Sequence, residues 1–85
     1  MDSNELSARI KSILVERLFL DIAPDQLGDQ ESLTIKYGVD SVRLFDMVVG
    51  LEDDFGICFA DDELRIANFD SVAVIAGRVA EKLKK

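Results

Sequence analysis

Apolar residues recur every three or four positions along most of this chain, and this helical spacing is the feature that most constrains its fold. We predict one helix over residues 4–20, capped by Ser3 or Asn4, and a second over residues 41–55, ended by Gly56. No segment alternates between apolar and polar residues for long enough to build a sheet. The chain is therefore expected to be all-α.

Two further helices are predicted in the last third of the chain. Asp61 is the expected N-cap of a short helix over residues 62–67. Asp70 or Ser71 is expected to cap a last helix that runs to about residue 83. The predicted fold is a small four-helix bundle with three main helices, a short third helix and a long first loop.

The long first loop, residues 21–40, lacks the helical spacing of its neighbours. It holds the only proline, Pro24, and the turn-forming Gly28 and Gly38. A loop of this length is uncommon in a small domain unless it serves a function. Its spaced apolar residues suggest that it is pinned to the core, and these residues are Ile22, Leu27, Leu33, Ile35 and Tyr37.

The formal net charge is −7, and most of it lies in the centre of the chain. Residues 21–70 contain 13 acids and 3 bases, whereas the last fifteen residues contain four bases and one acid. An acidic centre repels phosphate, which argues against DNA and RNA as partners, and it suits basic protein surfaces. The length of 85 residues allows one small domain over residues 1–85, which we expect to be monomeric.

No apolar run reaches the length of a membrane span, and the N-terminus lacks the profile of a signal peptide, so we expect a cytoplasmic protein without membrane contact. The chain has no histidine, which removes the usual general base and the commonest metal ligand. Its single cysteine, Cys58, lies between apolar neighbours and is expected to be buried. No spacing in the chain predicts a metal site.

The segment 41–55 has apolar residues on two opposite faces. One face is an ordinary core stripe made of Leu44, Met47, Val48, Leu51 and Phe55. The other face carries Val42, Phe45 and Val49, bordered by Asp46 and Asp53. Either the long first loop covers this second stripe, or the stripe is an apolar patch rimmed by acids that docks a partner.

The sequence YGVDSV, residues 37–42, leads into this helix. Asp40 and Ser41 are both preferred N-cap residues, so capping is the simplest role for Ser41. A nucleophilic hydrolase is excluded because no histidine can accept the serine proton and no G-x-S-x-G motif is present. A third possibility is a point of attachment, since backbone N–H groups and the helix dipole stabilise a phosphodiester at a helix N-terminus.

The same residues resemble the G-x-D-S-[LV] signature of acyl carrier proteins. The sequence LEDDFGICF follows at the spacing found in that family and is similar to its LEEEFGIEI helix end. The resemblance covers roughly residues 5–83, nearly the whole chain.

The resemblance implies a carrier and not an enzyme. Ser41 would receive a 4′-phosphopantetheine arm from coenzyme A through a phosphopantetheinyl transferase, and Asp40 matches the acid that precedes this serine. The thiol of the arm would hold acyl groups as thioesters for fatty-acid or related lipid or polyketide synthesis. The further partners implied are acyl-transferring and condensing enzymes with basic docking surfaces. The candidate partner-binding residues are Val42, Arg43, Phe45, Asp46, Val49 and Asp53.

Three departures from the family pattern suggest a specialised carrier with a restricted set of partners. Arg43 stands where housekeeping carriers usually have an acid, and Phe45 is bulkier than the usual residue. Phe59 and Ala60 replace an Ile-Pro pair.

Two other classes remain open from the residues themselves. The chain could be an unmodified helical interaction module that binds a basic partner through the stripe of Val42, Phe45 and Val49. A calcium sensor is a weaker alternative, because LEDDFG contains clustered acids but lacks the alternating D-x-D-x-D-G order and the distal bidentate glutamate.

Overall fold

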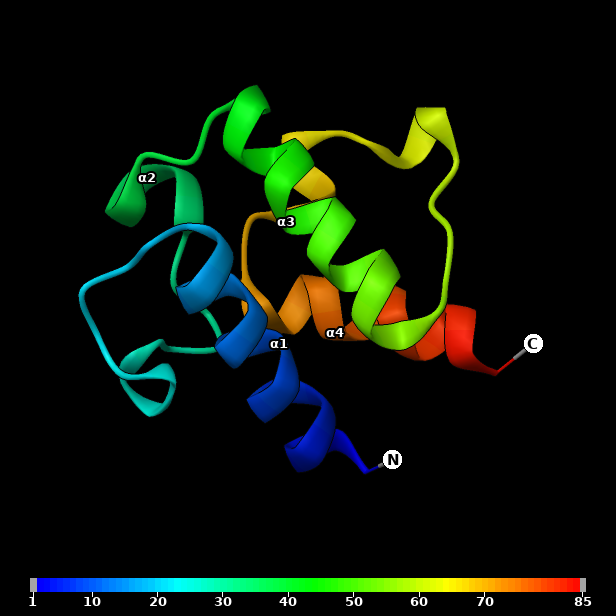
Figure 1. Ribbon diagram of the computed structural model, residues 1–85, viewed down its shortest axis with the longest axis horizontal. Helices are drawn as coiled ribbons and strands as arrows, with labels where there is room; N and C mark the ends of the chain where they lie inside the picture. The colour runs from blue at the N-terminus through cyan, green and yellow to red at the C-terminus, as the bar shows by residue number, and fades with distance from the viewer. Residues whose placement is uncertain (1, 85) are drawn as a thin grey trace.

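The computed structural model describes residues 2–84, and over this range the chain is helical without a β-strand. Its α-helices, in chain order, are α1 (Ser3–Arg17), α2 (Leu33–Tyr37), α3 (Ser41–Phe55) and α4 (Val72–Leu83), and its 3₁₀ helices are η1 (Pro24–Gln26), η2 (Asp61–Glu63) and η3 (Ile66–Phe69). The short α2 stands near the beginning of α3, while α1 and α4 pack against the rest of the bundle (Figure 1). The predicted all-α fold is confirmed.

The first helix begins earlier and ends earlier than the sequence predicts. The carboxylate of Asp2 accepts a hydrogen bond from the backbone N–H of Glu5 at 2.8 Å, so Asp2 is the N-cap. The helix ends at Arg17, because Phe19 has a left-handed backbone with φ of 54°. The apolar run around Phe19 conceals this ending in the sequence.

The helix α3 has the predicted boundaries, since both of its ends are set by local signals. Asp40 caps its start, and Gly56 closes its end in the left-handed conformation with φ of 65°. The last helix, α4, is capped by Ser71, whose hydroxyl accepts a hydrogen bond from the N–H of Val74 at 3.2 Å.

The first connection is pinned to the core as predicted, but it also contains the helix α2, which the sequence did not predict. Leu27 and Leu33 are buried, whereas Ile35 is 88% exposed and does not contribute to the core. Ser32 caps α2 by accepting a hydrogen bond from the N–H of Ile35. Asp70, just before α4, accepts hydrogen bonds from both this serine hydroxyl and the following residues of α2.

The short helix predicted over residues 62–67 is replaced by η2 and η3, so the short α-helix of the bundle lies before α3 and not after it. Side chains satisfy the backbone of this segment instead: Glu63 accepts a hydrogen bond from the N–H of Ala60 at 2.8 Å, and Asn68 donates one to the carbonyl of Glu63 at 2.9 Å. A segment this short is not stable as an α-helix on its own. The expectation that Cys58 is buried is also wrong, because the residue is exposed.

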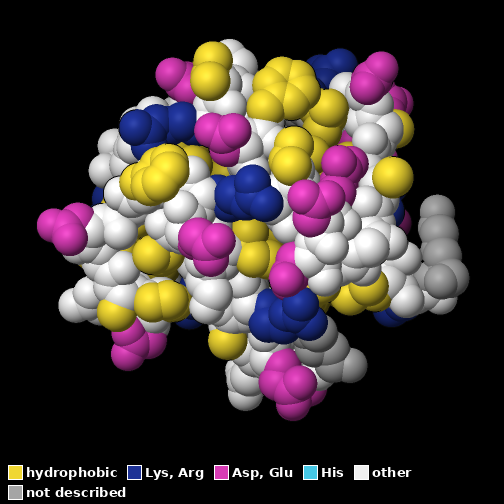
Figure 2. Space-filling view, in the orientation of Figure 1, with side chains coloured by type: hydrophobic (Ala, Val, Ile, Leu, Met, Phe, Trp, Pro, Cys, Tyr) yellow, Lys and Arg dark blue, Asp and Glu magenta, His cyan; other side chains and the backbone are white. Residues whose placement is uncertain are grey.

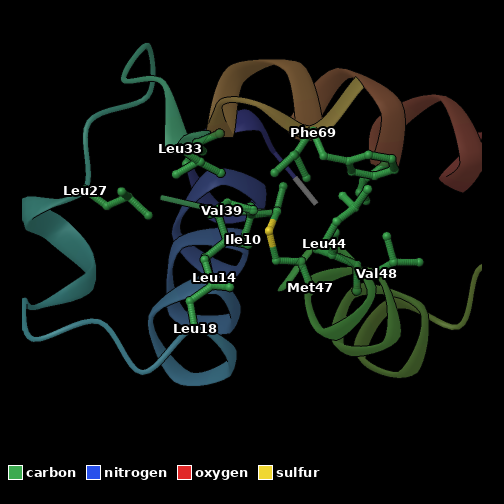
Figure 3. Packing of buried hydrophobic residues seen from close by; sticks show 14 of the residues in the cluster. Ile10, Leu14, Leu18, Leu27, Leu33, Val39, Leu44, Met47, Val48 and Phe69 are labelled. Atoms are coloured by element: carbon green, nitrogen blue, oxygen red, sulfur yellow. The ribbon is translucent and has the colours of Figure 1, made fainter. Parts of the chain in front are cut away.

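The core lies between α1, α3 and α4 (Figure 3), and the segments between these helices add the buried residues Leu27, Leu33, Val39, Phe59 and Phe69. The rings of Phe59 and Phe69 meet edge to face with centroids 5.2 Å apart, which fills the side of the core next to α4. Among the predicted core residues of α3, Leu44, Met47, Val48 and Leu51 are buried, and Phe55 is partly buried against the core.

Candidate functional site

The site begins with the three residues that join α2 to α3. Gly38 ends α2 in the left-handed conformation with φ of 64°, a backbone that glycine adopts without strain. Val39 is then buried in the core beside Leu33 (Figure 3), with its N–H donating to the carbonyl of Leu33 at 3.3 Å. These two contacts fix the position at which α3 starts.

Asp40, and not Ser41, is the N-cap of α3. Its carboxylate accepts a hydrogen bond from the N–H of Arg43 at 3.0 Å, and its carbonyl accepts one from the N–H of Leu44 at 2.8 Å. Ser41 is the first residue of the helix and is exposed, and within residues 2–84 its hydroxyl has no hydrogen-bond partner. The capping interpretation of Ser41 is therefore wrong, and the hydroxyl is available for other chemistry.

The second apolar face of α3, which we call the α3 stripe, consists of Val42, Phe45 and Val49. Their side chains are 72%, 59% and 45% exposed, respectively. The alternative in which the first loop covers this stripe is therefore wrong. Figure 2 shows hydrophobic and acidic side chains interspersed on the face of the molecule that α3 presents to the viewer.

The charged residues around the α3 stripe have different surroundings. Asp46 and Asp53 are exposed, and Asp53 lies 3.9 Å from the guanidinium of Arg17 on α1. Arg43 donates a hydrogen bond to the carbonyl of Leu18 at 3.2 Å, which ties the first turn of α3 to the end of α1. The structure thus brings the α3 stripe and both acids to one face, while the guanidinium of Arg43 reaches toward α1.

Within the described range, no three side chains of Asp, Glu, Cys or His come together in a way that could hold a metal ion. None of the helices in residues 2–84 combines the length and the apolar character that crossing a membrane requires. The site therefore consists of an exposed hydroxyl, a helix N-terminus and an apolar stripe with acidic neighbours.

Comparison with known proteins identifies this arrangement. A family described as "Phosphopantetheine attachment site" matches residues 8–79. The acyl carrier protein of Petrotoga mobilis is 33% identical over 64 residues, which cover 75% of this chain and 73% of that protein. The acyl carrier protein of Zymomonas mobilis is 31% identical over 61 residues, covering 72% and 76%.

The chain belongs to the acyl carrier protein family. It is a carrier and not an enzyme, and the prosthetic group of this family is a covalently attached 4′-phosphopantetheine. The residues present fit such a group, because Ser41 offers an exposed hydroxyl and the N–H groups of Ser41 and Val42 precede the first hydrogen bond of α3 to its cap.

The sequence does not predict the exposure of two apolar residues, Phe19 and Ile35, which are 90% and 88% exposed. Phe19 was expected to lie within a helix to residue 20, and Ile35 within a loop packed on the core. Neither position carries a local signal of exposure: Phe19 lies in an apolar run, and Ile35 alternates with polar residues like its buried neighbour Leu33.

Proposed function

We propose that Ser41 carries the 4′-phosphopantetheine arm, and that the arm's thiol holds acyl groups as thioesters for fatty-acid or related lipid or polyketide synthesis. The observation that carries the proposal is that Asp40, and not Ser41, is the N-cap of α3. Asp40 caps α3 with its carboxylate, which leaves the Ser41 hydroxyl exposed at the positive end of the helix.

The attachment reaction requires little from the carrier itself. The Ser41 oxygen attacks the phosphorus that bears the pantetheine, the bond to the adenosine bisphosphate part of coenzyme A breaks, and the serine proton leaves to a base of the transferase. The carrier contributes position: Asp40 keeps the first turn of α3 intact, and the N–H groups of Ser41 and Val42 stabilise the attached phosphate.

The candidate partners are a phosphopantetheinyl transferase and acyl-transferring and condensing enzymes with basic docking surfaces. Exposure of the α3 stripe beside Asp46 and Asp53 supports this, because apolar contacts with a charged rim are typical of transient docking. We propose that the carrier works in the cytoplasm as a monomeric domain over residues 1–85. Arg43 and Phe45 favour a specialised carrier with few partners.

The test is mass spectrometry after incubation with coenzyme A and a broad-specificity phosphopantetheinyl transferase. We expect the parent chain to gain the mass of one arm and Ser41→Ala to gain none. Ser12→Ala, which removes another exposed hydroxyl from α1, is the matched control and should gain the arm like the parent. An equal gain on Ser41→Ala would contradict the assignment.

The exposed α3 stripe also supports a second candidate, an unmodified interaction module that binds a basic partner. This alternative predicts no mass gain on the parent chain, and partner binding that survives Ser41→Ala. The same experiment therefore separates the two functions.

A further inference from the structure

Phe19 has a backbone conformation that is unfavourable for its side chain. The N–H of Leu20 donates to the carbonyl of Val15 at 3.0 Å, which is the 6→1 hydrogen bond of a Schellman motif at the end of α1. In this motif the residue before Leu20 adopts the left-handed backbone conformation, where glycine is usual and a bulky residue is strained. Phe19 occupies the position with φ of 54°.

The side chain of Phe19 gains nothing from packing to offset this strain. It is 90% exposed, more than any other large hydrophobic residue between residues 2 and 84. An aromatic ring that is both strained and exposed in the free protein stabilises nothing there. Its contribution is therefore expected in a complex.

Phe19 lies next to the first turns of α3. Arg43 joins the two segments through its hydrogen bond to the carbonyl of Leu18, the residue before Phe19. Phe19 also lines a shallow hollow of the surface together with Glu16, Arg17 and Asp46. Because Asp46 borders the α3 stripe as well, Phe19 extends the exposed apolar surface past this acid onto the end of α1.

The charge around Phe19 indicates the chemistry of its partner. Glu16, Asp46 and Asp21 are all exposed. The single base in the hollow, Arg17, is shared with Asp53 at 3.9 Å. Arg43 is a second base near the ring, because its guanidinium binds the carbonyl of Leu18, so three acids and two bases leave a net charge of −1 around Phe19. An aromatic ring in acidic surroundings complements an apolar pocket with a basic rim.

We propose that Phe19, in addition to the α3 stripe, anchors the phosphopantetheinyl transferase by inserting into an apolar pocket with a basic rim on that enzyme. The inference rests on the proposed modification of Ser41. An enzyme that acts on Ser41 must cover the first turn of α3, and a stable interface of ordinary size covers about 20–30 residues on each side. On a chain of 85 residues, that area reaches from Ser41 to the adjoining end of α1.

The experiment measures the initial rate of arm transfer at saturating coenzyme A, with a broad-specificity transferase, as a function of carrier concentration. Phe19→Asn removes the ring and tolerates the left-handed backbone, while Phe19→Tyr retains the ring. Val74→Ala shortens another exposed apolar side chain, on α4, and is the control. The melting temperature of each variant is measured alongside.

We expect Phe19→Asn to raise the KM for the carrier about tenfold, the effect of losing one interface anchor, with kcat unchanged. Its melting temperature should be no lower than that of the parent, because the strain is relieved. Phe19→Tyr and Val74→Ala should keep the parent KM. The ratio of the Phe19→Asn and parent KM values should not change with salt, since an apolar contact is not screened.

A parent-like KM for Phe19→Asn, on a parent chain that is modified, would overturn the anchor and leave the proposed function intact. A rise in KM accompanied by a lower melting temperature would assign Phe19 a structural role and overturn the anchor too. A parent chain that gains no arm at all would overturn the proposed function, and the docking of the transferase with it.

Discussion

Asp70 holds the short helix α2 in place, and its replacement should loosen the segment that positions Ser41. Its carboxylate accepts hydrogen bonds from the Thr34 hydroxyl at 2.6 Å, the Thr34 N–H at 3.0 Å and the Ser32 hydroxyl at 2.9 Å. Its carbonyl accepts a further one from the N–H of Leu33 at 2.7 Å. A helix of five residues has little stability of its own, so these contacts sustain it.

The size of the effect follows from these hydrogen bonds. A hydrogen bond to a charged acceptor contributes about 1.5–3 kcal/mol, and the three bonds to the half-buried carboxylate of Asp70 are not additive. We therefore expect Asp70→Ala to lower the free energy of unfolding by about 2–3 kcal/mol in total. For a domain of this size, the melting temperature should fall by about 10–20 °C. Asp70→Asn keeps the shape and one acceptor, and should cost about 1 kcal/mol.

The contribution of Asp70 also depends on pH. Hydrogen bonds from the hydroxyl and the backbone N–H of Thr34 lower the pKa of Asp70 below its ordinary value of 3.8, with a smaller opposing effect of burial. The folded pKa thus lies below the unfolded one. The stabilisation is complete above the unfolded pKa and is lost as the pH falls through the folded pKa.

The assay is urea unfolding followed by circular dichroism at several pH values. The difference in unfolding free energy between the parent and Asp70→Asn should be constant above about pH 5 and shrink below about pH 4. The pKa values of Glu31 and Glu63 are lowered as well, by hydrogen bonds from Lys36 and Lys82, so only this difference isolates Asp70. Parent-like stability of Asp70→Ala, or a difference that persists in acid, would refute the reasoning.

Two further predictions concern the glycines within α3 and α4 and the acids of α3. Gly77 on α4 faces open space, so Gly77→Ala should raise the free energy of unfolding in urea by about 0.5–1 kcal/mol. Gly50→Ala on α3 should gain less or destabilise, because its Cβ would lie 2.9 Å from side chains of α1. Equal gains from the two variants would show that α3 can move away from α1 without cost. Asp46→Asn should raise the KM of arm transfer at low salt about two- to fivefold. Asp53→Asn should raise this KM less, because Arg17 already offsets the charge of Asp53. A larger effect of Asp53→Asn would show that Asp46 is not the main acidic contact.

The parts of the structure that the sequence predicted are those governed by local signals. The boundaries of α3 follow from an N-cap at Asp40 and a left-handed glycine at Gly56, each acting within one turn. The division of α3 into a buried face and an exposed stripe follows from its own periodicity. The proposal for Ser41 also rests on a local pattern, because Gly38, Asp40 and the first turn of α3 all lie within a few residues of it.

The parts that were not predicted depend on contacts between distant residues. The helix α2 relies on Asp70, which is 36 residues beyond Thr34. The end of α1 is fixed by the burial of Leu18 and by the hydrogen bond from Arg43, and not by a glycine. Cys58 is exposed and the next residue, Phe59, is buried, and Phe59 packs on Phe69, which lies ten residues further along the chain.

The distribution of ion pairs explains why the acidic centre of the chain is not a uniform docking surface. At the C-terminal end of α3, Asp54 pairs with Arg9 and Asp53 lies near Arg17, so these acids attach α3 to α1. Arg9 also stacks over the ring of Phe55, with its guanidinium 4.9 Å from the ring centroid. Within residues 2–84, Asp46 has no such ion pair, and it lies one and a half turns from the start of α3.

The apolar stripe is most exposed toward the Ser41 end of α3, where Asp46 has no ion pair within the described residues and the guanidinium of Arg43 is turned to the carbonyl of Leu18. Val42 is 72% exposed, Phe45 59% and Val49 45%, so the exposed fraction of the stripe residues decreases along the helix away from Ser41. Complementary charge raises the association rate of a partner, and apolar contact lowers its dissociation rate. The exposure of the stripe and the free carboxylate of Asp46 therefore both favour the docking of a basic partner near Ser41, although the total charge of the chain carries no information about direction.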